Sequence, residues 1–265
     1  MKKSTYAYAI VILFLSILFP AKNFAQSDTL RTVENKAFRS GEELYFDIDY
    51  GFFTVGEAEL LVFPGDSVFN RKTYHVLSKA KSKPFFDAFF KVRDRYESFI
   101  DSAGIFPWRF IQHVREGSYR KDYGAFLNQL SGVAVSNKAE TPIKPYTHDI
   151  ISAFYYVRTL DFSGFREGER IHLNNFFADK TYPLDVVYHG KERVDVEAGE
   201  FDCIIVEPLV AAGGLFKNEG RILIWLTNDD AKMPVKVSSK VLIGSITAEL
   251  TKYKGVYGAL TSKVD

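Results

Sequence analysis

From Gly41 onward, hydrophobic and polar residues alternate in short stretches that are rich in Val, Ile, Tyr, Phe and Thr. Gly, Pro, Asp and Asn separate these stretches. Alternation with a period of two, interrupted by residues that favour turns, is typical of antiparallel β-strands. We therefore predict a mainly β protein with strands at residues 43–51, 56–63, 73–81, 94–101, 107–116, 118–126, 169–177, 182–189, 193–198, 201–210, 220–227, 233–242 and 245–254.

One segment, residues 147–160, departs from this alternation and has the period of an α-helix. Its apolar side chains recur three or four positions apart, at Ile150, Ala153, Phe154 and Val157. Thr147 is placed to cap the first turn, and Arg158 is favoured at the negative end of a helix. Because apolar residues occupy most of its circumference, we predict one long helix over residues 147–160 that the sheet largely covers.

The chain also resembles itself when it is shifted by 127 residues. This shift aligns Gly41-Glu42 with Gly168-Glu169 and Gly117-Ser118 with Gly244-Ser245, without a net gap. We interpret residues 41–265 as a single β domain of two related halves, at about 40–125 and 167–254, joined by the connection that contains the helix. A chance similarity between two β meanders is the alternative interpretation.

The first 25 residues have the pattern of a secretory signal peptide. Lys2 and Lys3 precede an apolar run from about Tyr6 to Phe19, and a cleavage point follows near Ala25/Gln26. The apolar run is short for a membrane span, which makes a retained anchor the less favoured alternative. We expect an exported, periplasmic protein with no membrane span after signal removal, in which residues 26–40 form an extended arm.

Charge and cysteine content exclude several classes of function. Without its first 25 residues the chain keeps 31 basic and 33 acidic residues, a net charge of −2, so we expect no nucleic-acid partner. Apolar residues make up 46% of the chain and aromatic residues 15%, enough for a sizeable core. The single cysteine, Cys203, lies in an apolar run, where we expect a buried, unreactive thiol.

The search for catalytic or metal-binding patterns is negative. The histidines, His75, His113, His148, His172 and His189, lack zinc-ligand spacing. The sequence contains no G-x-S-x-G elbow and no phosphate-binding loop. Asp149 beside His148 is a candidate acid–base pair, but neighbours on a strand point to opposite faces. We therefore expect no catalytic residue, no metal, no cofactor and no enzymatic activity.

Several blocks together resemble one exported Gram-negative family. These are "GEELYFDIDYGFFTVGEAEL", "KVRDRYESFID", "HDIISAFYYVRTL" and "IWLTNDDAKMPVKV", in this order along the chain. The family is labelled only as domain of unknown function 3108 (DUF3108). The resemblance implies a periplasmic, mainly antiparallel β protein with a strongly curved, barrel-like sheet, and it implies no activity, cofactor or catalytic residue.

The stretch "SKPFFDAFFKVRDRYESFID", residues 82–101, places four phenylalanines before a row of charges. Pro84 is able to begin a helical turn that aligns the aromatic side chains. We ask whether this aromatic corner is a ligand pocket, a membrane-touching loop or core. The predicted ligand-binding residues are Phe86, Phe89, Phe90, Tyr155, Arg158 and Trp225, with Arg158 holding an anionic headgroup. The alternative is that all six pack or cap. For the pocket we expect Phe89→Ala to unfold early, and Phe90→Ala and Arg158→Ala to fold but to lose the ligand.

These observations favour a periplasmic binding or carrier protein of the cell envelope without catalytic activity, for an apolar or amphipathic ligand such as a lipid or glycan. The absence of catalytic patterns, the apolar helix and the abundant aromatic residues support this prediction. The alternative is a structural or assembly protein that acts through an envelope protein partner, and a hydrolase is less favoured. Charges on both faces of the strand "KVRDRYE" disfavour an outer-membrane barrel.

Overall fold

The computed structural model describes residues 30–210, 220–241 and 244–264. The chain divides into two units, Met1–Leu30 and Arg31–Asp265, and all elements described below belong to the second unit. The predicted signal peptide, its cleavage point near Ala25/Gln26 and the first residues of the predicted arm lie outside the described residues. Arg31 to Ser40, the remainder of the arm, contain no strand or helix.

Within the described residues, the chain forms one large antiparallel sheet and two short helices. The strands are β1 (Glu43–Tyr50), β2 (Phe53–Val68), β3 (Arg71–Ser82), β4 (Arg93–Asp101), β5 (Pro107–Glu116), β6 (Tyr119–Asn128), β7 (Val133–Ser136), β8 (Glu140–Pro142), β9 (Arg170–Phe177), β10 (Lys180–Val196), β11 (Gly199–Val210), β12 (Ile222–Thr227), β13 (Pro234–Lys240), β14 (Ser245–Lys254) and β15 (Lys263–Val264). The helices are α1 (Pro84–Asp87) and α2 (Ile150–Arg158).

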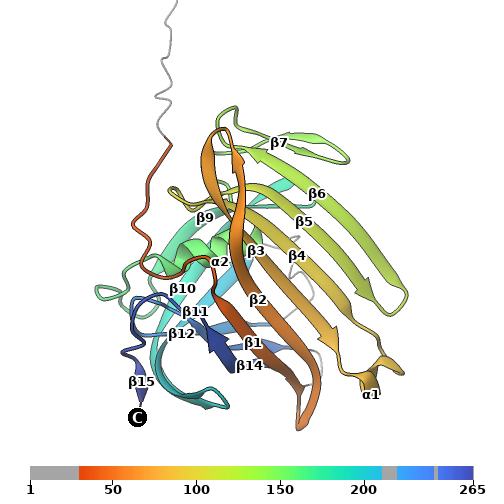
Figure 1. Cartoon of the computed structure of the whole chain (residues 1–265), viewed down its shortest axis with the longest axis vertical. Helices are drawn as coiled ribbons and strands as arrows, with labels where there is room; N and C mark the ends of the chain where they lie inside the picture. The colour runs from red at the N-terminus through yellow and green to blue at the C-terminus, as the bar shows by residue number, and fades with distance from the viewer. Residues whose placement is uncertain (1–29, 211–219, 242–243, 265) are drawn as a thin grey trace, which may run out of the picture. The chain divides into compact units, whose positions relative to one another are not determined.

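The sheet is built from two meanders that are joined along one strand pair. Its order is β8-β7-β6-β5-β4-β3-β2-β1-β14-β13-β12-β11-β10-β9, and β15 pairs with β11. Consecutive strands are neighbours in the sheet from β1 to β8 and from β9 to β14, and the pairing of β1 with β14 joins these two runs (Figure 1). The end strands β8 and β9 do not pair with each other, so this antiparallel sheet is not closed.

The strands from β1 to β6 and from β9 to β14 follow the 127-residue spacing of the predicted repeat. β1 begins at Glu43 and β9 at Arg170, and β5 begins at Pro107 and β13 at Pro234. Each half also opens with the same backbone link. Gly41 donates to the carbonyl of Val62 and Gly168 to that of Tyr188, both at 2.8 Å. The two meanders thus share strand order and spacing, and their common origin stays a prediction.

If the two halves were equivalent, β6 would pair with β9 as β14 pairs with β1. The structure has no such strand pair, and we call the side-chain contacts found there, around Tyr123, Thr141 and Asp179, the seam. Tyr123 on β6 donates to Asp179 Oδ1 at 2.9 Å, and Thr141 donates to the Asp179 carbonyl at 3.0 Å. His148 forms an isolated parallel bridge with Asn175 on β9. The two ends of the curved sheet are therefore connected by side-chain hydrogen bonds and one isolated bridge, and not by a strand pair.

Helix α2 is shorter than predicted, since it spans Ile150–Arg158 and not residues 147–160. The cap is Asp149 rather than Thr147. Ser152 N donates to Asp149 Oδ1 at 2.8 Å, and Asp149 N donates to Ser152 Oγ at 3.0 Å, which forms a capping box. His148 is already engaged with β9, which holds the preceding backbone outside the helix. The helix lies on the inner side of the curved sheet (Figure 1).

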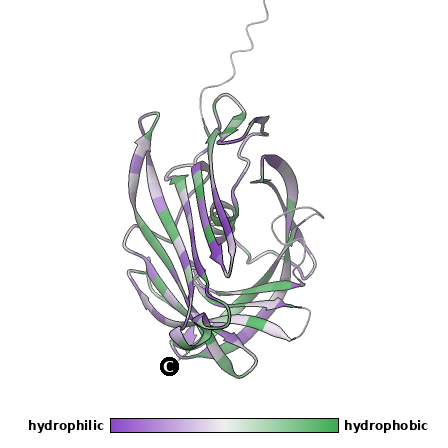
Figure 2. Cartoon of the chain, turned by 90° about the vertical axis from the view of Figure 1, so that its right-hand side faces the viewer, coloured by the Kyte–Doolittle hydropathy of each residue, from purple (hydrophilic) through white to green (hydrophobic). Residues whose placement is uncertain are grey.

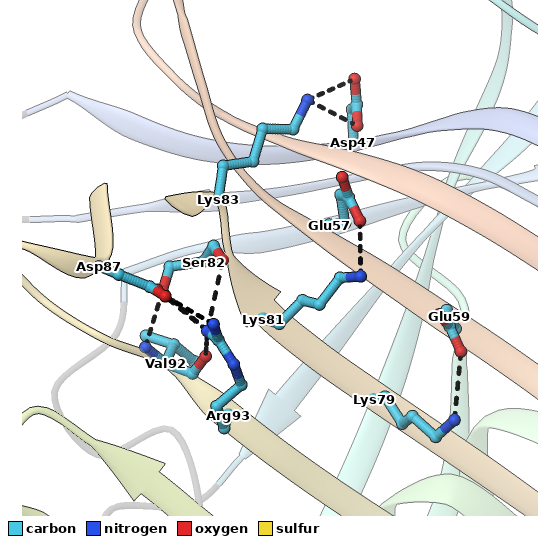
Figure 3. A network of polar contacts seen from close by, with 10 residues as sticks. All are labelled: Asp47, Glu57, Glu59, Lys79, Lys81, Ser82, Lys83, Asp87, Val92 and Arg93. Carbon is cyan, nitrogen blue, oxygen red and sulfur yellow. Dashed lines mark hydrogen bonds and ion pairs between the residues drawn. The ribbon is translucent and has the colours of Figure 1, made fainter. Parts of the chain in front are cut away.

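Hydrophobic and hydrophilic residues alternate along many of the strands (Figure 2), whereas β11 and β12 have buried apolar residues on both faces. On the outer face of β1 to β3, opposite charges stand side by side (Figure 3). Three ion pairs follow one another, Glu59–Lys79 at 3.4 Å, Glu57–Lys81 at 3.0 Å and Asp47–Lys83 at 3.4 Å. A slip of one residue would turn these charges toward the interior, so the pairs help to specify strand register.

Candidate functional site

A cavity of about 650 Å³ lies between α2 and the inner face of the sheet. Both halves of the chain contribute to its wall. The first half supplies Phe46, Ala58 and Leu60, and the second supplies Ile224, Val237 and Ala248. Ala58 and Ala248 among these inward positions leave space that larger side chains would fill. The cavity therefore follows from the alternation of the strands and from residue size at the inward positions.

A second cavity, of about 290 Å³, lies on the same side of α2, against β10 to β13. It shares Ile150, Phe154, Ile224 and Val237 with the first cavity. Nearly all of its other lining side chains are aliphatic, as Leu184 illustrates. The two spaces thus border a common set of apolar residues, so an apolar chain bound in one is adjacent to the other.

Two polar atoms in these walls have no hydrogen-bond partner among the described residues. They are Oε1 of Gln112, in the first cavity, and Oγ of Ser239, in the second. The Gln112 side chain is only 3% exposed, so solvent does not readily replace a missing partner. A buried polar atom without a partner costs about 1–3 kcal/mol. A small movement of the wall would therefore be needed before either atom could accept a hydrogen bond from a bound molecule or from water.

Lys121 lines the first cavity close to the seam. Its Nζ lies 4.8 Å from the ring centre of Phe177 and 5.6 Å from that of Tyr123. Burial lowers the pKa of Lys121, Lys138 lowers it further, and Asp179 opposes the shift. No carboxylate oxygen lies within 4.0 Å of Lys121 among the residues that the structure describes. This ammonium group lies near two aromatic rings, in a cavity wall that also contains Glu59 and Glu116.

The six predicted ligand-binding residues lie in three separate places, and none of them lines either cavity. Phe86, Phe89 and Phe90 belong to the connection around α1, as Pro84 at the helix start suggested. Phe89 is 77% exposed and Phe90 is 56% exposed. The expectation that Phe89 supports the core is therefore wrong, because its ring projects into solvent at the end of the sheet.

Tyr155 and Arg158 lie in the interior, both with 0% exposure. The guanidinium group of Arg158 donates to both oxygens of Glu42, at 2.6 and 2.8 Å, and to the carbonyls of Ala37 and Ala231. Although burial lowers the pKa of Arg158, the Glu42 carboxylate raises it overall. The headgroup contact predicted for Arg158 is thus replaced by an internal ion pair, which Tyr155 joins through its hydroxyl at 3.4 Å from Glu42.

Trp225 occupies a third place, on β12. Its Nε1 donates to Glu192 Oε2 at 2.7 Å, and Lys236 lies 5.8 Å from its ring centre. The side chains of its neighbours Ile224 and Leu226 point to the opposite face of the strand, and Ile224 lines the cavities. Residues 222–226 of β12 are all apolar, so the sequence does not distinguish the two faces of this strand, and the prediction chose Trp225 where the structure places Ile224 at the cavities.

The pair His148 and Asp149 belongs to a buried polar cluster. Arg31 donates to His148 Nε2 at 3.2 Å, and Ser98 donates to Asp149 Oδ2 at 2.6 Å. Burial and the nearby Arg31 lower the pKa of His148 to about 3, and burial raises the pKa of Asp149 to about 6. Neither residue lines a described cavity. The cluster anchors the start of α2, and its partners are all within the protein.

The thiol of Cys203 is also enclosed by the protein. Cys203 is buried, and burial raises the pKa of its thiol to about 12.

In residues 30–210, 220–241 and 244–264, no cluster of three His, Cys, Asp or Glu residues is arranged to hold a metal ion. The same part of the chain has no helix with the length and apolarity needed to cross a membrane.

Solved structures with a similar backbone come from several bacteria. A beta-barrel-like protein of domain of unknown function DUF1849 from Brucella abortus is 13% identical, with a TM-score of 0.53 over 87% of this chain and 100% of that one. A proposed exported protein with a YmcC-like fold from Bacteroides fragilis is 11% identical, with a TM-score of 0.35 over 84% and 99%. A proposed lipoprotein from Parabacteroides distasonis is 10% identical, with a TM-score of 0.37 over 85% and 100%.

The likeness to the Brucella protein confirms the predicted mainly β, barrel-like fold and carries no information on activity. No curated protein matches this chain in sequence. The family model for proteins of unknown function designated DUF3108 matches residues 45–251. Because this match covers well over half of the chain, the protein belongs to the DUF3108 family.

Proposed function

We propose that this protein is a periplasmic, non-catalytic carrier that holds one amphipathic molecule, such as a lipid, between α2 and the sheet. The observation that carries the proposal is the cavity of about 650 Å³ with its mainly apolar wall. Its size falls within the range of roughly 300–1,000 Å³ that is usual for sites of small molecules. The adjoining cavity of about 290 Å³ adds apolar surface for an extended chain.

The polar atoms of the cavity support an amphipathic rather than a purely apolar ligand. Lys121 lies in the wall near the seam, and Gln112 Oε1 is able to accept a hydrogen bond deeper in the wall after a small movement. A hydrocarbon without polar groups would leave the Gln112 oxygen unsatisfied, at a cost of about 1–3 kcal/mol. Because Glu59 and Glu116 also line the cavity with Lys121, the ligand class that fits these residues is an amphiphile with an apolar chain and a polar headgroup that contains a hydrogen-bond donor.

Native mass spectrometry of the protein purified from the periplasm tests this proposal. We expect the wild type to retain a lipid-like molecule and the variant Ala248→Phe to lose it, because Ala248 lines the cavity and a phenyl ring occupies part of the space. Thr247→Phe is the matched control, since position 247 precedes Ala248 on β14 and points to the other face. Repeated recovery of an empty wild type, or equal ligand content in all three proteins, would contradict the proposal.

The alternative role in envelope assembly predicts a different result in the same cells. An assembly protein should give one dominant protein partner after crosslinking, whereas a carrier should not. Crosslinking of the wild type and of Ala248→Phe separates the two roles. A partner that both proteins retain, without any bound amphiphile, would favour assembly.

A further inference from the structure

Aromatic side chains project from one end of the sheet, at the connections β1–β2, β3–β4 and β5–β6. Phe52 and Phe53, at the β1–β2 turn, are 104% and 66% exposed. In the connection around α1, Phe85 is 72% exposed and Phe89 is 77% exposed. Figure 1 shows α1 at the end of β3, outside the body of the sheet. We call Phe52, Phe53, Phe85, Phe89, Phe90 and Tyr119 the aromatic rim.

Backbone contacts join these connections into one surface. Lys83 N donates to the Val55 carbonyl at 2.9 Å, which ties the start of the α1 connection to β2 just after the first turn. Gly117 N donates to the Lys91 carbonyl at 2.8 Å, which ties the end of the same connection to the β5–β6 turn. The Phe90 ring lies so close to Gly117 that a Cβ atom there would be 2.9 Å from it. The rim is therefore a contiguous surface that the fold holds in place.

The charges around the rim favour an anionic partner. Lys83 pairs with Asp47, and Arg93 pairs with Asp87 at 2.6 Å (Figure 3). Lys91 and Arg120 are exposed, and within the described part of the chain neither has a carboxylate oxygen inside 4.0 Å. Arg120 instead donates to the backbone carbonyls of its own turn. Among the described residues, Lys91 and Arg120 are thus two exposed cations near these rings that form no ion pair.

The rim also borders the cavity. Tyr119 is 55% exposed at the β5–β6 turn, and it lines the cavity together with Lys121 on the same strand. A molecule that leaves the cavity on this side passes the aromatic rim. Exposed aromatic rings on loop tips, combined with Lys and Arg, are the combination that inserts into the boundary between lipid headgroups and acyl chains.

We propose that the aromatic rim docks on the surface of an anionic lipid bilayer and brings the open side of the cavity to the membrane. Lys91 and Arg120 contact the headgroups, and the phenylalanines enter the interface. Docking goes beyond the proposed carrier function and does not require a bound ligand. The rim consists of several protruding side chains, and a deformable lipid surface can surround them more easily than a flat protein surface can.

Co-sedimentation of the full mature chain with vesicles of phosphatidylethanolamine and phosphatidylglycerol tests the docking proposal. The variant Phe85→Ser/Phe89→Ser should bind at least about tenfold more weakly, since transfer of each ring is worth roughly 1.5–3 kcal/mol and 1.4 kcal/mol is tenfold. Leu130→Ser is the control, because Leu130 is exposed but lies in the β6–β7 turn. Both rim positions are exposed, so the double variant should fold as the wild type does.

The same assay distinguishes this proposal from its alternatives. Lys91→Gln/Arg120→Gln should weaken binding to these vesicles and leave binding to phosphatidylcholine vesicles unchanged. Ala248→Phe should bind vesicles as the wild type does even where it loses the cavity ligand, so the two proposals fail separately. Equal vesicle binding by the wild type and the rim variant would overturn the docking proposal. Absence of vesicle binding, with a protein captured through the rim in cells, would overturn it in favour of a protein partner.

Discussion

Removal of the buried cation Arg158 is the most direct test of how this fold is held together. In Arg158→Met, the Glu42 carboxylate stays at 0% exposure without its two charge-assisted hydrogen bonds, and the carbonyls of Ala37 and Ala231 lose a donor. Loss of one partner from a buried ion pair costs about 3–5 kcal/mol. Because a domain is stable by only about 5–15 kcal/mol, this variant should lose a large part of its stability.

Equilibrium urea unfolding of four proteins measures the effect. Glu42→Gln/Arg158→Met removes both charges, so its free energy of unfolding should be higher than that of Arg158→Met alone, although the latter carries fewer substitutions. Lys81→Met is the control, because the Lys81–Glu57 pair lies on the outer face with side chains 52% and 43% exposed. That variant should change stability by no more than about 1 kcal/mol.

Two results would refute the reasoning on Arg158. One is a loss of less than about 1 kcal/mol in Arg158→Met, which is the range of an exposed pair. The other is an unchanged free energy of unfolding together with loss of a bound amphiphile, which is the behaviour of a headgroup contact. The second result would restore the role that the position of Arg158 at the end of the helix first suggested.

Two further predictions concern titration and thiol reactivity. Between pH 3.8 and about 6 the native state holds a proton on Asp149 that the unfolded state has released, so this group stabilises less as the pH rises. His148 has the opposite effect, since its pKa falls from 6.5 to about 3 and acid favours the unfolded state. In urea unfolding from pH 4 to 7, Asp149→Asn should therefore lose stability on acidification by up to about 1.4 kcal/mol per pH unit, whereas the wild type should be nearly flat; parallel profiles would contradict this. Cys203, with a buried thiol of pKa about 12, should react with a maleimide only after unfolding, and rapid labelling of the native protein would disprove its burial.

The strands could be predicted from the sequence because a strand shows itself by local alternation of hydrophobic and polar residues. Alternation around Ala58 and Leu60 in β2, for example, predicts their inward face without knowledge of the neighbouring strand. Residues 182–189 and 193–198 were predicted as separate strands, but they form one strand, β10, with an irregularity in its pairing between Tyr188 and Lys191. The short strands β7, β8 and β15 were missed, since two to four residues are too few to show a period.

The candidate site was harder to predict, because its ion pairs and cavity walls are formed by residues that are far apart in the sequence. Glu42 lies 116 positions before Arg158, and nothing in the sequence around either residue indicates that they meet. Phe89 was misjudged because an aromatic ring predicts burial only on average, and the α1 connection turns it outward. Lys121 and Gln112 were not predicted as site residues, since both line a cavity that forms only when strands distant in the sequence come together.

The pairing of β1 with β14 also bears on the order in which the chain folds. Glu43 lies opposite Lys254, 211 positions later, so the two meanders cannot be joined until nearly the whole chain is available. Contacts over such separations close slowly, and an unpaired strand edge is prone to associate with other chains in the meantime. A polypeptide delivered with its amino terminus first therefore keeps one edge of β1 open until its last long strand arrives.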